Sequence, residues 1–171
     1  EASGDVKHKL KKLGYEPDAV RRVSIAMYEG EINMVIHANG GEAVVDIDPD
    51  RVDIVLKDTG PGIADVEQAM QAGWSTAPDN VRALGFGAGM GLPNMKKYSD
   101  EMKIDSVVGE GTTVTMTVLH QLHQALSHRG HPGSGGQSGH RQRALYRLRR
   151  VHPHLSPSRQ AGPARPPFPA Q

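Results

Sequence analysis

Glu29 and Asn33 lie four positions apart in a segment that is otherwise strongly apolar. On a helix this spacing places both side chains on one face, one turn apart, and His37 continues the same row. A carboxylate and an amide oxygen directed at one cavity suit Mg²⁺ and could orient an attacking hydroxyl group. An isolated pair of this kind is more often part of a solvated helix face. On a mostly apolar helix, however, buried polar groups need partners.

Asp58 opens the second pattern, Asp58-Thr59-Gly60-Pro61-Gly62, directly after a stretch that alternates like a strand. A carboxylate at a strand end can accept a hydrogen bond from an exocyclic amine such as N6 of adenine. Gly60 and Gly62 would let the backbone turn sharply and approach a flat base. An ordinary turn is the alternative interpretation, with about equal weight.

A glycine-rich stretch forms the third pattern, with glycines at every second position from 85 to 91. Without Cβ atoms, successive N–H groups can point at phosphate oxygens, and a helix that starts here adds free donors. The pattern is neither a P-loop nor a dinucleotide-binding fingerprint. A flexible loop without function would have the same composition. The residues predicted to hold phosphates are Gly85, Gly87, Gly89, Met90, Gly91 and Leu92.

Thr112 follows the Gly109-Glu110-Gly111 turn at the start of a segment rich in β-branched residues. Such a turn usually does no more than connect two strands. The Thr112 hydroxyl could nevertheless contribute to a nucleotide pocket.

Hydrophobic periodicity predicts the elements that must position these residues. The expected helices span residues 6–13, 17–38, 65–72 and 92–99, and the expected strands span 42–48, 52–57, 102–108 and 112–119. Residues 73–91 are expected to form a loop. This order predicts an α/β (α+β) two-layer sandwich, in which a mostly antiparallel mixed sheet is covered by helices on one face.

Charge divides the chain near His120. Residues 1–119 carry all 19 acidic residues and 12 of the 20 Lys and Arg, whereas residues 120–171 carry eight Arg and neither Lys nor acid. The second segment holds seven of the nine His and seven of the twelve Pro. We therefore expect a folded domain over 1–119, which holds the four patterns, and a largely disordered tail over 120–171, in which residues 141–151 could form a short basic helix. The composition of residues 120–171 fits a frame error or a cloning extension as well as it fits a genuine tail.

The sequence contains no cysteine, which excludes disulfides and thiolate chemistry. No run of about 18 apolar residues is present, so no membrane partner is expected and a cytoplasmic location is compatible. Net charge alone is weak evidence for a nucleic-acid partner, and none is expected. The chain begins at Glu1 rather than Met, which suggests a processed start or a fragment.

The four patterns, in this order, resemble the N, G1, G2 and G3 boxes of the Bergerat-fold (GHKL) ATPases. This superfamily includes gyrase, MutL, histidine kinases and anti-sigma factor kinases. The segments Glu29–Ala38, Gly73–Thr76 and Leu84–Met95 look most like the anti-sigma factor and switch serine kinase branch (RsbW/RsbT type). Family members usually begin with a further strand. No such strand is expected before the first helix of this sequence, so a sheet edge is expected to be missing or unpaired.

The resemblance implies ATP and Mg²⁺ as cofactors and a role for each motif. Glu29 would be the general base, Asn33 the Mg²⁺ ligand, Asp58 the reader of adenine, and residues 85–91 the lid over the phosphates. His37, Gly60, Gly62 and Thr112 would complete the nucleotide site, and Arg82 is a further candidate for a phosphate contact.

The implied activity is that of a protein serine/threonine kinase in a bacterial partner-switching system. Its substrate would be a serine on a STAS-domain antagonist, and phosphorylation would regulate a sigma factor or a stress pathway. The alternative is an ATP-gated anti-sigma module that sequesters a sigma factor with little kinase activity. A homodimer is left open.

Overall fold

The computed structural model of the chain describes residues 2–83, 86–120 and 142–149. Its helices are α1 (Ala2–Lys12), α2 (Pro17–Ala38), α3 (Val66–Ala69), α4 (Asp79–Ala83) and α5 (Gly91–Lys97). Its strands are β1 (Gly40–Asp48), β2 (Arg51–Lys57), β3 (Glu101–Val107), β4 (Gly111–Leu119) and β5 (Gln142–Arg149). None of the described helices is long and apolar enough to cross a membrane.

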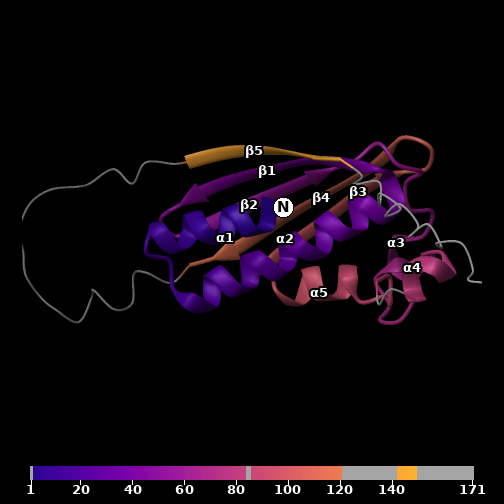
Figure 1. Cartoon of the computed structure of the whole chain (residues 1–171), viewed down its shortest axis with the longest axis horizontal. Coiled ribbons are helices and arrows are strands. Elements are labelled where there is room, and N and C mark those ends of the chain that lie inside the picture. The colour runs from indigo at the N-terminus through magenta and orange to yellow at the C-terminus, as the bar shows by residue number, and fades with distance from the viewer. Residues whose placement is uncertain (1, 84–85, 121–141, 150–171) are drawn as a thin grey trace, which may run out of the picture.

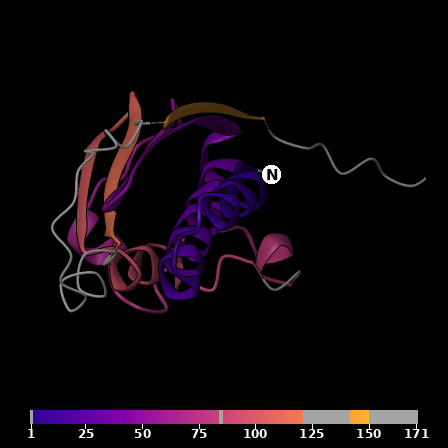
Figure 2. The same ribbon diagram turned by 90° about the vertical axis from the view of Figure 1, so that its left-hand side faces the viewer.

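The strands form one sheet in the order β3-β4-β2-β1-β5, and each neighbouring pair of these described strands is antiparallel. Helices α1, α2 and α5 cover one face of this sheet, which curves around them (Figures 1 and 2). The predicted two-layer α+β architecture with a mostly antiparallel sheet is therefore confirmed.

The core lies between α2 and the sheet. Val23 and Met27 of α2 are fully buried, as are Val45 of β1, Ile54 of β2 and Met116 of β4. Strands with every second residue buried present one apolar face to the helices. Burial of each such side chain contributes about 1.5–3 kcal/mol, so this layer supplies the main stabilisation of the fold.

Helix α2 has the predicted bounds, because residues at its two ends determine where it starts and stops. Pro17 occupies the first turn, where no backbone N–H is needed, and Asn39 adopts the left-handed conformation at the C-terminal end (φ 60°). Glu31 is buried on this helix, and its carboxylate accepts hydrogen bonds from the Ser3 backbone N–H (3.1 Å) and hydroxyl (2.5 Å). The first turn of α1 is thereby fastened to α2.

Tyr15 connects the helical layer to the sheet. Its hydroxyl donates a hydrogen bond to the carbonyl oxygen of Asp48, and its ring stacks on that of His120 with a centroid separation of 4.2 Å. Burial raises the pKa of Tyr15 to about 12, and the nearby carboxylates of Asp48 and Asp50 add to this effect. The hydroxyl therefore remains a donor throughout the physiological range.

Residues 73–91, predicted to be a loop, contain the short helix α4. The N–H groups of Val81 and Arg82 donate to the carbonyl of Pro78, which closes the first turn. Proline followed by aspartate is typical of the start of a helix, as at Pro78-Asp79. The glycines that follow this pair favoured the prediction of a loop instead.

The predicted basic helix over 141–151 is wrong, because residues 142–149 form strand β5 instead. This strand pairs with β1 from Gly40↔Arg149 to Ile47↔Gln142, so the edge that was expected to be unpaired has a partner. An open strand edge offers a row of free N–H and C=O groups, and only an extended segment can satisfy them. The remainder of 120–171, apart from His120, lies outside the described residues, as does the predicted disorder there.

Candidate functional site

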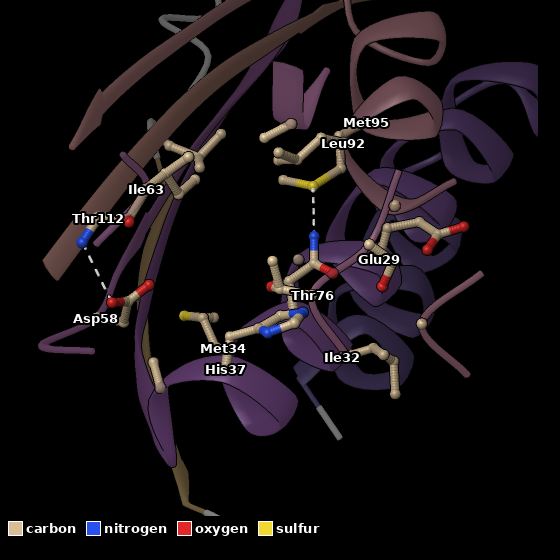
Figure 3. A pocket seen from close by; sticks show the side chains of 18 of the residues that line it. Glu29, Ile32, Met34, His37, Asp58, Ile63, Thr76, Leu92, Met95 and Thr112 are labelled. Carbon is tan, nitrogen blue, oxygen red and sulfur yellow. Dashed lines mark hydrogen bonds between the residues drawn. The ribbon is translucent and has the colours of Figure 1, made fainter. Parts of the chain in front are cut away.

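A cavity of about 500 Å³ opens between α2, the sheet and the segments that follow β2 and precede α5. This volume is typical of small-molecule sites. The predicted site residues among those that line it are Glu29, Asn33, His37, Asp58, Gly62, Gly87, Gly89, Gly91, Leu92 and Thr112. The structure therefore brings residues of all four sequence patterns to one place. In Figure 3 Asp58 and Thr112 lie on one side of the cavity and Glu29 on the other.

The polar row of α2 faces this cavity as its helical spacing predicted. Asn33 donates weakly through Nδ2 to the Met95 sulfur, at 3.8 Å, the contact marked by the upper dashed line in Figure 3. A Cβ atom on Gly91 would lie only 2.8 Å from Asn33 Oδ1. Glycine at this position thus allows α5 to begin directly against the amide of Asn33.

Glu29 is held from the opposite helix. Its Oε1 accepts a hydrogen bond of 2.7 Å from Nδ2 of Asn94, in α5. Among the described residues no second hydrogen bond or ion pair reaches this carboxylate, so Oε2 is free to accept a proton from another group.

Asp58 is fixed at the end of β2 by two backbone N–H groups. Both donate to Oδ1, from Gly60 at 2.8 Å and from Thr112 at 3.2 Å. Within the described part of the chain, Oδ2 has no such partner and remains free as an acceptor. The Thr112 hydroxyl is already engaged with that of Ser106, at 2.8 Å, so it supports the pocket wall.

Gly60 does not line the cavity, although it shapes it. A Cβ atom there would meet Cβ of Ala38 at 2.6 Å, so the turn after Asp58 can lie against the end of α2 only because the residue is glycine. Glycine is thus required here for close packing against α2, whereas the predicted approach to a flat base stays a prediction.

His37 lines the cavity and is exposed to solvent on α2. Partial burial lowers the pKa of His37, and the negative charge of Asp58 opposes the shift without cancelling it. The lowered pKa favours the neutral imidazole, which can donate through one nitrogen and accept through the other.

The glycine-rich segment is docked onto the loop before it. The carbonyl of Gly89 accepts a hydrogen bond from Gly73 N–H at 2.9 Å, and a Cβ atom on Gly89 would lie 2.5 Å from the backbone of residues 73 and 74. Gly87 and Gly89 have φ values of 70° and 74°, which favour glycine.

Three candidates from this region are placed differently. Met90 is exposed and does not line the cavity, Gly85 lies outside the described residues, and Arg82 forms an ion pair with Asp79 on α4 at 2.9 Å. Arg82 also does not line the cavity, so the structure gives no support to its predicted phosphate contact.

Several residues of the cavity were not predicted from the sequence as site residues. Ile63, Trp74 and Thr76 contribute apolar and hydroxyl surface, and Asn94 reaches Glu29. Trp74 is the only tryptophan of the chain. This feature of the sequence could have indicated it as a candidate lining residue. No local signal singles out Asn94, because its partner lies 65 positions away.

The donor set fits a nucleotide with Mg²⁺. Among the described residues no group of three or more His, Cys, Asp or Glu could hold a metal ion by itself. A metal at Asn33 would therefore complete its coordination with phosphate oxygens and water, as Mg²⁺ commonly does. The free Oδ2 of Asp58 and the apolar surface of Ile63 and Met34 suit an amino-substituted aromatic base.

Comparison with known proteins agrees with this geometry. Residues 4–118 match the family model described as "Histidine kinase-like ATPase domain". The chain belongs to this family. Its similarity to the "Serine/threonine-protein kinase RsbT" of Bacillus subtilis strain 168 is 33% identity over 108 residues, 61% of this chain and 75% of RsbT. The "Anti-sigma F factor" of Pasteuria penetrans is 37% identical over 101 residues, 55% of this chain and 64% of that factor.

These relatives place this histidine kinase-like ATPase domain in the anti-sigma factor and switch-kinase branch, as the motifs indicated. Among solved structures, the "Mycobacterial sensor histidine kinase MprB" matches with a TM-score of 0.45 and 19% identity, over 59% of this chain and 72% of that one.

Proposed function

We propose that this protein is an ATP-dependent serine/threonine kinase that phosphorylates a serine on a STAS-domain antagonist in a partner-switching system. The observation that carries the proposal is the position of Glu29, Asn33 and Asp58 around one cavity. The similarity to RsbT, itself named a serine/threonine-protein kinase, supports it.

Each residue has a task that follows from its surroundings. Asp58 would accept the exocyclic amine of adenine through Oδ2, since its Oδ1 is occupied by Gly60 and Thr112. Backbone N–H groups between Gly85 and Gly91 would face the phosphates. When bound, Mg-ATP supplies the phosphoryl group and neutralises its charge, and Asn33 would provide a protein oxygen to the metal.

Glu29 would accept the proton of the substrate serine through its free Oε2 as the serine oxygen bonds to the terminal phosphorus of ATP. The bond from that phosphorus to the bridging oxygen breaks, and ADP leaves. Phosphoryl transfer needs little covalent help from a protein, so positioning and charge account for most of the acceleration. A correctly placed base typically contributes about 10²–10⁴-fold.

The test is transfer of radiolabelled phosphate from Mg-ATP to a purified STAS-domain protein. We expect phosphoserine on the antagonist, and we expect Glu29→Ala to lower the rate about 100-fold or more while the Kd for ATP changes little. Glu16→Ala removes an exposed carboxylate at the start of the same helix and is the matched control. Equal transfer by wild type and Glu29→Ala would exclude Glu29 as the base.

A second candidate function is favoured by the similarity to anti-sigma F factors. In that case the domain would sequester a sigma factor when ATP is bound, with little transfer of phosphate. ATP-dependent sigma binding by a protein that labels no STAS antagonist would select this alternative.

A further inference from the structure

We infer that Asn94 is a positioning residue that holds the carboxylate of Glu29 in the orientation needed to accept the substrate proton. The inference rests on the proposed kinase function and assigns to it a residue outside the four sequence motifs. Its starting observation is the 2.7 Å hydrogen bond from Asn94 Nδ2 to Glu29 Oε1.

The packing of two helices determines this contact. Helix α5 lies alongside α2 (Figure 1), and two glycines permit the close approach. A Cβ atom on Gly91 would lie 2.8 Å from Asn33 Oδ1 of α2, and one on Gly30 would lie 3.3 Å from Met95 of α5. With the helices this close, the short amide of Asn94 reaches across to Glu29.

The backbone of Asn94 is fixed as well as its side chain. Its N–H donates to the carbonyl of Met90 at 2.9 Å, and its own carbonyl accepts from Tyr98 N–H at 3.0 Å. Met95, the next residue, is fully buried in the core. The amide donor is therefore presented from a rigid turn, directly after the glycine-rich segment.

The chemistry needs such a donor. A glutamate side chain has three rotatable bonds, so an untethered carboxylate samples many orientations. One hydrogen bond to Oε1 restricts these rotations and leaves Oε2 available for the proton. Misplacement of a reacting group by about 1 Å can cost on the order of 100-fold in rate. Asn94 is not among the residues that line the cavity, so we expect its effect to pass through Glu29.

Two substitutions separate the hydrogen bond from packing. Asn94→Ala removes the donor, and Asn94→Asp keeps the shape but removes the donor and places a second carboxylate beside Glu29. We expect Asn94→Ala to lower kcat for transfer to the STAS protein about 10-fold, and Asn94→Asp to lower it further, with KM for ATP within about twofold of wild type. Lys96→Ala, at an exposed position of the same helix, is the control and should leave kcat unchanged.

A double-mutant cycle distinguishes positioning of Glu29 by Asn94 from a purely structural role of Asn94. In a Glu29→Gln background, Asn94→Ala should cause no further loss of transfer, because the group it positions no longer accepts a proton. Equal losses in both backgrounds would overturn the inference, as would a changed KM for ATP with unchanged kcat.

Failure of the proposed function is distinguishable from failure of this inference. If the wild type labels no STAS protein, the kinase proposal is wrong. The hydrogen bond between Asn94 and Glu29 can then be tested by NMR of the Asn94 side-chain amide. Its resonances should shift in Glu29→Ala and remain unchanged in Glu16→Ala. An Asn94 amide that is insensitive to Glu29→Ala would overturn the inference whatever the activity.

Discussion

At the scale of single residues, the two carboxylates of the cavity differ in the donors that surround them. Asp58 receives two backbone N–H groups on one oxygen, whereas Glu29 receives one side-chain amide. Each keeps one oxygen free within the described structure. Both residues line the cavity, and the sequence could single them out because helical spacing and the position after a strand are local properties; their predicted roles stay predictions.

His37 provides a prediction at this scale. Its pKa lies below the ordinary value of 6.5 because of burial, and Asp58 raises it. We expect Asp58→Asn to lower the pKa of His37 further, since burial then acts alone; an NMR titration of the imidazole protons measures it. An unchanged or higher pKa in Asp58→Asn would contradict the assigned cause.

The same shift has a consequence for stability. Because the folded pKa of His37 is lower than the unfolded one, the unfolded chain binds more protons between the two values. The contribution of His37 is thus fully present above about pH 6.5, and it is lost as the pH falls toward the folded pKa. His37→Gln should remove this part of the pH dependence.

At the scale of elements, most helices and strands follow from periodicity and from the residues that stop them. Asp65 caps α3 through a hydrogen bond from Gln68 N–H to its Oδ1, at 2.9 Å, and the helix ends earlier than predicted. Helix α4 was not predicted, because the glycines that follow Pro78-Asp79 favoured a loop. The docking of the glycine segment onto Gly73 was not predictable, because it joins two loops without regular structure.

Gly89 and Gly73 form a matched pair for testing that docking. Both have positive φ values, 74° and 87°, so alanine strains the backbone at either position. Only at Gly89 would the new Cβ also meet backbone, at 2.5 Å, whereas at Gly73 nothing lies within 4 Å. We expect Gly89→Ala to weaken ATP binding at least 10-fold more than Gly73→Ala, measured by the fluorescence of Trp74. Equal effects would show that the contact is unimportant for the nucleotide.

At the scale of the whole molecule, the sheet is completed by a strand from a segment whose composition suggested none. Strand β5 satisfies the outer edge of β1 over eight residue pairs. Without it, the backbone groups of that edge would be open to pairing with another chain.

A truncation tests this role of β5. A chain that ends at residue 141 should unfold at a lower temperature and associate in a concentration-dependent way, measured by calorimetry and sedimentation velocity. A chain that ends at residue 149 retains β5 and is the control. The same melting temperature and a monomeric state for both would show that β5 does not protect the edge.

The sequence by itself determined the two-layer fold and those residues of the cavity that local patterns reveal. The period of 3.6 residues in a helix and of 2 in a strand fixes which side chains share a face. Glycines mark where the backbone must turn or lie close to another segment. Only the tertiary structure decided that Asn94 reaches Glu29, that Trp74 lines the cavity and that β5 pairs with β1. These contacts join residues far apart in the chain, and they arise from how closely the helices and strands pack, which no local pattern encodes.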